Sequence, residues 1–172
     1  MGTSARRNVT PLHLGIATAV AAAVADQAAK LWLLFGYDLP ARGRLVLTPF
    51  LDIVLAWNTG ISYGLFREAG PAAQWVLFAA TLAIIALLGV WLARTSSRLS
   101  SIALGLIIGG AIGNVIDRAV HGAVMDFVLF HITAATWTFQ WYAFNVADIA
   151  IVAGVVGLLY ESLFARNAAK AP

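Results

Sequence analysis

Four apolar stretches, each close to the length of a membrane-spanning helix, constrain the fold of this 172-residue chain more than any other feature. A helix needs about 20 apolar residues to cross about 30 Å of hydrocarbon. Because 61% of the residues are hydrophobic, the chain has too little polar surface for a water-soluble globule of this size. We therefore expect an all-α polytopic membrane protein with one membrane domain over residues 1–172, whose spans lie at about 13–35, 71–93, 99–118 and 141–164.

The first stretch could instead be a cleaved signal peptide. It is long for one, it contains Asp26, Gln27 and Lys30, and three more apolar stretches follow it. We therefore favour its retention as the first transmembrane helix. The third stretch carries glycines that we expect to form one face of small residues, which lets helices approach closely in lipid. These glycines are Gly105, Gly109, Gly110 and Gly113.

The segment 36–70 differs in kind, because it contains Gly, Pro and six charged residues. Two short β-prone runs, Leu45–Leu47 and Ile53–Leu55, flank residues 48–50. This pattern predicts a strand pair or small sheet outside the bilayer. We interpret the later segment 119–140 as a mixed loop.

The basic residues predict the orientation. Cytoplasmic segments of membrane proteins carry an excess of Lys and Arg. With a cytoplasmic N-terminus, the segment 36–70 and the segment 119–140 lie outside, and Asp26, Asp117 and Asp148 come out toward that outer side. The inner segments then hold six basic residues and no acidic residue, namely Arg6, Arg7, Arg94, Arg98, Arg166 and Lys170.

Three of the eight acidic residues fall between positions 109 and 148, each beside an apolar run. A carboxylate near membrane depth is costly unless it is paired or hydrated, so such an acid is a candidate functional residue. Asp26 has Lys30 one turn away, and Asp117 has Arg118 beside it, so structural ion pairs are an alternative reading for these two acids. Asp126 and Asp148 have no cation within a turn of sequence. Two converging aspartates can share one proton, as in aspartic proteases.

The sequence lacks the residue patterns of zinc, serine and cysteine hydrolases. The three histidines, His13, His121 and His131, lie far apart and do not form a zinc-binding spacing. No Gly-x-Ser-x-Gly turn occurs, and the chain has no cysteine. We therefore expect neither a metal nor a cofactor.

Five short blocks occur in order between Asp26 and Ile151. In this order and spacing they resemble the signature blocks of the lipoprotein signal peptidase family, also called signal peptidase II. The blocks are Asp26-Gln27-x-x-Lys30, Asn58-Thr59-Gly60-Ile61-Ser62, Gly113-Asn114-x-x-Asp117-Arg118, Val124-x-Asp126-Phe127 and Phe144-Asn145-x-Ala147-Asp148.

The resemblance implies a bacterial inner-membrane aspartic endopeptidase that removes signal peptides from prolipoproteins, cutting before a diacylglyceryl-modified cysteine. It implies four helices with an extracytoplasmic β-cradle and a lid-like insertion within 36–70, where Ile61-Ser62-Tyr63 departs from the family's usual order. By position, Asp126 and Asp148 correspond to the catalytic pair. The residues that correspond to substrate-binding or supporting positions are Asp26, Asn58, Gly60, Asn114, Asp117, Arg118 and Asn145.

The expected partners are lipid-modified prolipoproteins and membrane lipids, without nucleic acid, and we expect a monomer with both termini in the cytoplasm. Two other classes stay open. Proton-coupled transporters and channels also carry membrane-embedded Asp and Arg residues. Four spans are few for a transporter, however, and no inverted repeat is visible. A purely structural subunit is the third class, disfavoured by the acids without a local cation.

Overall fold

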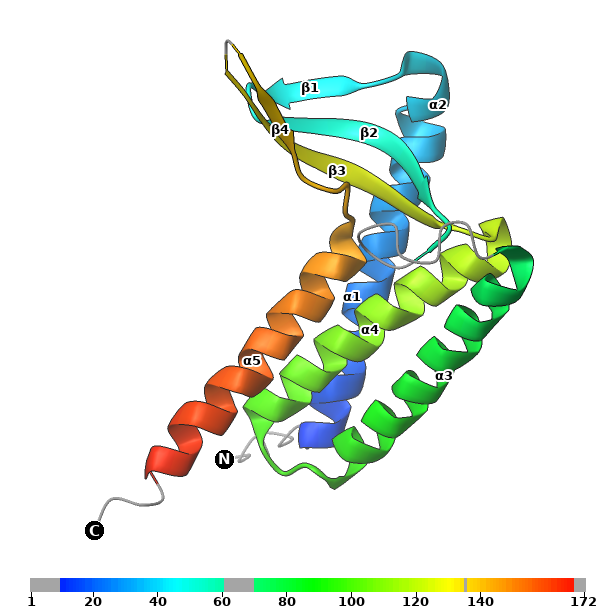
Figure 1. Ribbon diagram of the computed structural model, residues 1–172. Helices are drawn as coiled ribbons and strands as arrows, with labels where there is room; N and C mark the ends of the chain where they lie inside the picture. The colour runs from blue at the N-terminus through cyan, green and yellow to red at the C-terminus, as the bar shows by residue number, and fades with distance from the viewer. Residues whose placement is uncertain (1–9, 61–69, 135, 169–172) are drawn as a thin grey trace, which may run out of the picture.

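The computed structural model describes residues 10–60, 70–134 and 136–168. Among these residues, four helices are long and apolar enough to cross a membrane, as the fold-class prediction requires. A small antiparallel sheet covers one end of the helices (Figure 1). The elements in chain order are α1 (Pro11–Leu31), a π-helical segment (Trp32–Gly36), α2 (Leu39–Arg42), β1 (Leu45–Thr48), β2 (Leu51–Asn58), α3 (Gly70–Arg94), α4 (Arg98–His121), β3 (Val124–Thr133), β4 (Thr138–Gln140) and α5 (Val146–Ala168).

The last helix begins at Val146, later than the predicted start at 141. Phe144 is still extended and forms a β-bridge with Val128. Asn145 then caps the helix, because its Oδ1 accepts the backbone N–H of Asp148 at 2.9 Å. In return, Asp148 Oδ2 accepts the backbone N–H of Asn145 at 3.1 Å. This reciprocal pair is a capping box, which fixes both the start of α5 and the position of Asp148 in its first turn.

The sheet has the order β1-β2-β3-β4, with antiparallel neighbours. Strands β1 and β2 confirm the strand pair predicted within 36–70. The interpretation of 119–140 as a loop was wrong, because β3 and β4 occupy most of it and β3 pairs with β2. Helix α4 ends at His121 and is capped by Gly122, whose φ of 70° lies in the left-handed region that glycine adopts freely, and the chain then reverses into β3. The Ile61-Ser62-Tyr63 block of the proposed lid lies outside the described residues.

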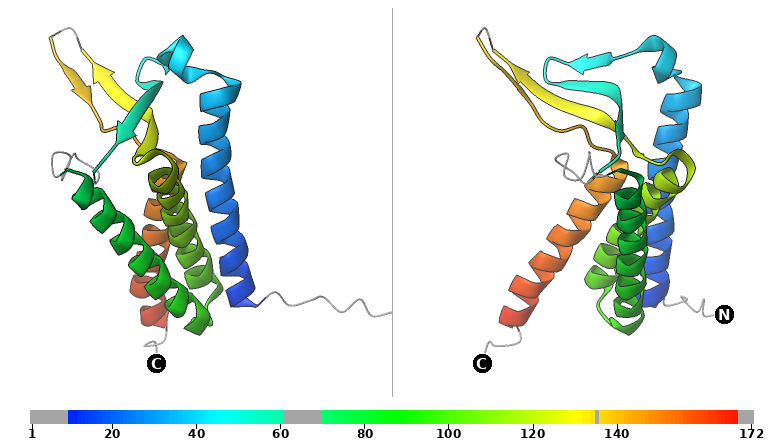
Figure 2. Two further views of the ribbon diagram at one scale, coloured as in Figure 1. Left: turned by 90° about the vertical axis from the view of Figure 1, so that its right-hand side faces the viewer. Right: turned by 45° about the vertical axis from the view of Figure 1, so that its right-hand side comes forward.

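Helix α4 lies between α1, α3 and α5, and it is the most buried of the four long helices (Figures 1 and 2). Gly105 and Gly109 face α1, where their Cα atoms approach the carbonyl oxygens of Gly15 and Ala19 so closely that a Cβ would lie 2.4 and 2.3 Å from them. Gly110 does not share this face, because a Cβ there would meet the Ala147 carbonyl oxygen of α5. The predicted single glycine face is therefore two faces, which let α4 pack closely against both neighbours.

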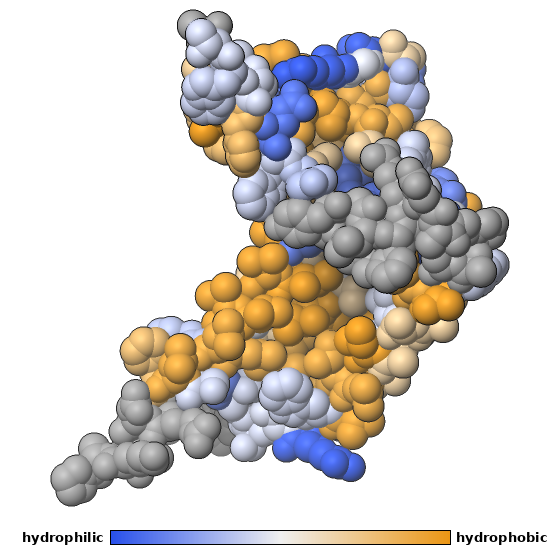
Figure 3. Space-filling view, in the orientation of Figure 1, coloured by the Kyte–Doolittle hydropathy of each residue, from blue (hydrophilic) through white to orange (hydrophobic). Residues whose placement is uncertain are grey.

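The two ends of the bundle differ. The sheet lies at one end. The N-terminal end of α1, the described C-terminal end of α5 and the turn that joins α3 to α4 lie at the other end (Figures 1 and 2). The surface over the helices is mainly apolar, and hydrophilic residues gather at the sheet end and near the opposite end (Figure 3). This distribution is that of a membrane protein whose sheet lies outside the hydrocarbon.

Candidate active site

Asp126 and Asp148 come together where the sheet meets the helices. Asp126 belongs to β3 and Asp148 to the first turn of α5. Asn145 links the two, since its side-chain amide donates to Asp126 Oδ1 at 2.7 Å while its backbone N–H donates to Asp148 Oδ2 at 3.1 Å. Asp126 and Asn145, which are 19 positions apart in sequence, thus share one hydrogen-bonded unit with Asp148.

The Asp126 carboxylate is buried, with 4% of the residue exposed. Strand pairing brings Asn58 beside it, because Asn58 pairs with Val124 and its amide donates to Asp126 Oδ2 at 3.1 Å. Burial and, to a smaller extent, the negative charge of Asp148 raise the pKa of Asp126 to about 6. The hydrogen bonds from Asn58 and Asn145 and the charge of Lys30 limit the rise. Asp126 therefore changes protonation within the range in which an acid–base catalyst works.

Asp148 is half-buried and receives donors from three directions. Asn114 of α4 donates its side-chain amide to Asp148 Oδ1 at 3.2 Å. The N-terminus of α5 supplies the positive end of the helix dipole, and the capping box holds the carboxylate there. Asn114 also accepts a hydrogen bond from the Asn145 amide at 3.2 Å, which joins both asparagines to the aspartate pair.

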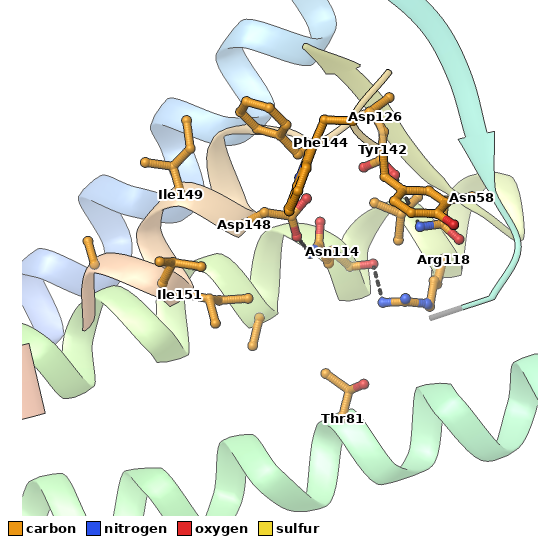
Figure 4. Close-up of a pocket in the computed structure, with 16 residues that line it drawn as sticks. Asn58, Thr81, Asn114, Arg118, Asp126, Tyr142, Phe144, Asp148, Ile149 and Ile151 are labelled. Atoms are coloured by element: carbon orange, nitrogen blue, oxygen red, sulfur yellow. Dashed lines mark hydrogen bonds between the residues drawn. The ribbon is translucent and has the colours of Figure 1, made fainter. Parts of the chain in front are cut away.

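Both aspartates line one cavity of about 750 Å³. Figure 4 shows Asp148, Asn114 and Arg118 along its polar wall, with Thr81 of α3 across the open space. Apolar side chains of α5 and of the segment before it complete the lining. The cavity thus presents a small polar centre within an apolar wall, which is the usual form of a binding site for an amphipathic substrate. The apolar and aromatic lining residues of this part are Trp141, Tyr142, Ala143, Phe144, Ile149, Ile151, Val152 and Ala153.

Arg118 has a different role from the one predicted from sequence. The suggestion that it neutralises Asp117 was wrong, because consecutive helix residues do not face each other. Its guanidinium instead donates to the backbone oxygens of Asn114 at 3.5 Å and Gly60 at 3.4 Å. Gly60 in turn donates its N–H to Asn58 Oδ1 at 3.0 Å. Arg118 and Gly60 therefore connect α4 to the end of β2 at the rim of the cavity.

Asp26 and Asp117 lie behind Asp126 and Asp148 and are not among the residues that line the cavity. Lys30 pairs with both, at 2.6 Å from Asp26 Oδ2 and 2.8 Å from Asp117 Oδ2. The predicted Asp26–Lys30 ion pair is therefore present, and the second acid of this cluster comes from α4.

Sequence reasoning did not single out Lys30 or Gln27 as site residues, although both stand in the first conserved-looking block of the resemblance. Gln27 donates to Asp117 Oδ1 at 2.9 Å and to the Gly113 carbonyl at 3.1 Å. A lysine in the last turn of a largely apolar helix was the signal that could have identified this position, because a buried ammonium needs more than one partner. In the described ranges, no group of three or more His, Asp or Glu side chains is placed to hold a metal ion.

The chain is similar in sequence and in fold to known proteins. The family model described as signal peptidase (SPase) II matches residues 18–164. The lipoprotein signal peptidase of Nitrobacter hamburgensis is 58% identical over 164 residues, which cover 95% of this chain and 100% of that protein. The lipoprotein signal peptidase of Rhodopseudomonas palustris (strain TIE-1) is 56% identical with the same coverage. A solved structure described as a bacterial membrane enzyme at 2.3 Å resolution has the same fold, with a TM-score of 0.73, 24% identity and 91% coverage of each chain. The chain therefore belongs to the signal peptidase II family.

Proposed function

We propose that this chain is an aspartic endopeptidase that removes signal peptides from diacylglyceryl-modified prolipoproteins, with Asp126 and Asp148 as its catalytic pair. The observation that carries this proposal is the shared hydrogen-bond unit, in which Asn145 contacts both carboxylates and both line one cavity. The family is one of proteases, and two relatives of this chain are lipoprotein signal peptidases.

The chemistry follows from two carboxylates that share one proton. The ionised carboxylate removes a proton from a water molecule, whose oxygen attacks the carbonyl carbon of the scissile peptide bond. The protonated carboxyl donates a hydrogen bond to the carbonyl oxygen, on which negative charge develops. Collapse of the tetrahedral intermediate breaks the C–N bond, and the amine leaves with a proton from the pair. Because burial and the negative charge of Asp148 raise the pKa of Asp126 to about 6, the pair keeps one proton up to about pH 6.

The lining of the cavity supports a lipidated substrate. Its polar centre is surrounded by side chains of α5 such as Ile149 and Val152, which are also exposed on the membrane-facing surface of the helix. Acyl chains that remain in lipid stabilise the bound state by about 0.8 kcal/mol for each buried CH₂. A diacylglyceryl group would thereby hold the scissile bond at the depth of the two aspartates.

The membrane setting completes the proposal. The sheet lies at the end of the bundle opposite the N-terminal end of α1 and the described C-terminal end of α5 (Figure 1). Asp126 in β3 and Asp148 in the first turn of α5 belong to the sheet end. Arg94 and Arg98 lie at that opposite end, beside the turn that joins α3 to α4. The positive-inside tendency then puts both termini in the cytoplasm and the aspartates toward the extracytoplasmic face of the bacterial inner membrane. We propose one membrane domain that acts as a monomer among membrane lipids, with the segment 36–70 as β-cradle and lid.

The test is cleavage of a purified prolipoprotein by the purified protein in detergent, with release of the signal peptide read on a gel. The diacylglyceryl-modified precursor should be cut, and the same precursor without its lipid should be cut poorly. Asp126→Asn and Asp148→Asn should each lower cleavage by at least about 10³-fold while the protein stays folded. Near-normal cleavage by either variant would reject the aspartic mechanism, and equal cleavage of both precursors would reject the anchoring role of the lipid.

A further inference from the structure

A buried lysine stands behind the catalytic pair and contacts three polar side chains. Lys30 is 3% exposed. Its ammonium lies 2.6 Å from Asp26 Oδ2 and 2.8 Å from Asp117 Oδ2, and it donates to Asn114 Oδ1 at 3.4 Å. The ammonium thus joins α1, which carries Lys30 and Asp26, to α4, which carries Asp117 and Asn114.

The first acid of this cluster holds the backbone next to Asp148. Asp26 Oδ2 contacts Lys30, and its other oxygen, Oδ1, accepts the backbone N–H of Ala147 at 2.9 Å. Ala147 is fully buried and directly precedes Asp148. Asp26 therefore fixes the first turn of α5, and with it the point from which the Asp148 side chain extends.

The second acid holds the backbone next to Asp126 in the same way. Asp117 Oδ2 contacts Lys30 and accepts the backbone N–H of Met125 at 3.0 Å. Met125 is 1% exposed and directly precedes Asp126. Each of the two outer acids thus binds the N–H of the residue before one catalytic aspartate.

Gln27 connects the two outer acids independently of the lysine. Its amide donates to Asp117 Oδ1 at 2.9 Å and to Asp26 Oδ2 at 3.3 Å. Lys30 also fixes the orientation of the Asn114 amide, because a carbonyl oxygen turned toward the ammonium leaves the NH₂ group turned toward Asp148, to which it donates at 3.2 Å.

We infer that Lys30, through Asp26 and Asp117, is a positioning residue that sets the spacing and orientation of Asp126 and Asp148; this inference rests on the proposed function. Two acids and one lysine are buried here at a cost in desolvation that apolar side chains would avoid. A cluster that served helix packing alone would not need both of its acids to bind backbone N–H groups beside the reacting residues. What these contacts have in common is that each fixes the position of Asp126 or Asp148. A misplacement of about 1 Å can lower a rate by about 10²-fold.

The decisive variants are Lys30→Met and Asp117→Asn. Asp117→Asn keeps the side-chain volume and leaves Lys30 paired with Asp26, so this variant decides the matter if Lys30→Met does not fold. For folded variants we expect kcat on the lipidated precursor to fall by about 10²-fold, with KM changed by less than about threefold.

Two inhibitors provide a readout that a structural role would not move. In one, a hydroxyethylene group replaces the scissile amide, so that its hydroxyl lies between the two carboxylates; in the other, the same peptide lacks that hydroxyl. Affinity for the hydroxyl-bearing peptide should fall in parallel with kcat, and affinity for the peptide without it should not change.

Asp52→Asn is the matched control. Asp52 is also a fully buried acid in a charged cluster, with His131 Nε2 at 2.9 Å and the Arg44 guanidinium, but it lies in the sheet away from the pair. The Asp52→Asn variant should have lower thermal stability but no selective loss of affinity for the hydroxyl-bearing peptide.

Each outcome decides the inference. Loss of stability in Lys30→Met and Asp117→Asn with kcat of the folded fraction unchanged would overturn it, as would failure of both to fold, because the cluster would then be structural. If the unsubstituted protein cut no prolipoprotein, the proposed function itself would fail, and that result is distinct from a normal enzyme whose variants keep their kcat.

Discussion

The Asn145 side-chain amide donates to Asp126 Oδ1 at 2.7 Å, while the same residue caps the helix that carries Asp148. A helix cap is ordinarily a local device, but here its side chain also reaches the neighbouring strand. Asn145 therefore contributes both to the start of α5 and to the orientation of the Asp126 carboxylate. Any change at Asn145 acts on both aspartates together.

The hydrogen bond from Asn58 should affect the basic limb of the pH–rate profile. Asn58 donates to Asp126 Oδ2 and so stabilises the ionised carboxylate, which lowers the pKa of Asp126 below the value that burial alone would give. Asn58→Ala removes this donor, so the pKa should rise above about 6. Because the pair must keep one proton, the rate falls as pH passes this pKa, so the basic limb of kcat/KM should move to higher pH. Steady-state kinetics from about pH 4 to about pH 8 measure the shift. An unchanged limb would contradict the proposed role of Asn58.

Stability should depend on pH through Asp126 in a defined direction. Its folded-state pKa, about 6, lies above the ordinary value of 3.8, so the folded protein keeps this proton to higher pH than the unfolded chain does. The contribution of Asp126 to stability is therefore lost as pH rises from 3.8 to about 6. Asp126→Asn does not titrate, and its melting temperature minus that of the unsubstituted protein should increase across this window and then level off. Thermal unfolding in detergent at several pH values measures this difference, and a constant difference would contradict the assigned pKa.

The two aspartates should act as one unit in mutant kinetics. Each single Asp→Asn change removes either the general base or the shareable proton, so little remains for the second change to remove. The double variant Asp126→Asn/Asp148→Asn should thus be scarcely slower than either single variant. Single-turnover cleavage of the lipidated precursor measures the three rates. Multiplicative losses would indicate that the residues act separately, and inhibition of the unsubstituted protein by chelators would point to a metal-dependent reaction.

Much of this site could be predicted from the sequence because its polar residues are expensive in an apolar chain. Asp126 and Asp148 stood out since neither has a local cation, and the structure places both at one cavity. The Asp26–Lys30 pair could be read from its spacing of one helical turn. The helical spacing and the free-energy cost of burying a charged side chain were sufficient to identify these residues from local sequence.

The remaining features depend on contacts between distant parts of the chain. Strand β3 was missed because it is central in the sheet and also packs on the helices, so its residues from Val124 to Phe127 are all buried and do not alternate. Asp117 was assigned to Arg118 because sequence proximity suggested that partner. Its actual partner, Lys30, comes from another helix, and no local pattern encodes that approach.

The proposed topology can be tested with fusions. Arg94 and Arg98 flank the turn that joins α3 to α4, and the remaining basic residues of the inner segments lie near the chain ends. A reporter that is active only in the cytoplasm should therefore report activity when it is fused after Arg98 or after Lys170. A reporter that is active only outside should do so when it is inserted near Arg42. The reverse pattern would put the aspartates on the cytoplasmic side and would exclude precursors that are cut after translocation.

A matched pair of glycine substitutions tests the close packing of α4 against α1. At Gly109, a Cβ would lie 2.3 Å from the Ala19 carbonyl oxygen and 2.8 Å from the Ala22 Cβ, so the helices must separate to admit it. Gly109→Ala should therefore destabilise the protein by about 1–3 kcal/mol, the typical cost of overpacking.

At Gly89 of α3, a Cβ would meet no atom of the described residues within 4 Å. Gly89→Ala should leave stability unchanged or raise it by up to about 1 kcal/mol, because alanine restricts the unfolded chain and favours helix. Unfolding of both variants in one detergent measures the difference. Equal unfolding free energies for Gly109→Ala and Gly89→Ala would contradict the close packing of α4 against α1. Activity gives a second reading, because displacement of α1 also displaces Lys30 from Asp117, and kcat should then fall in Gly109→Ala but not in Gly89→Ala.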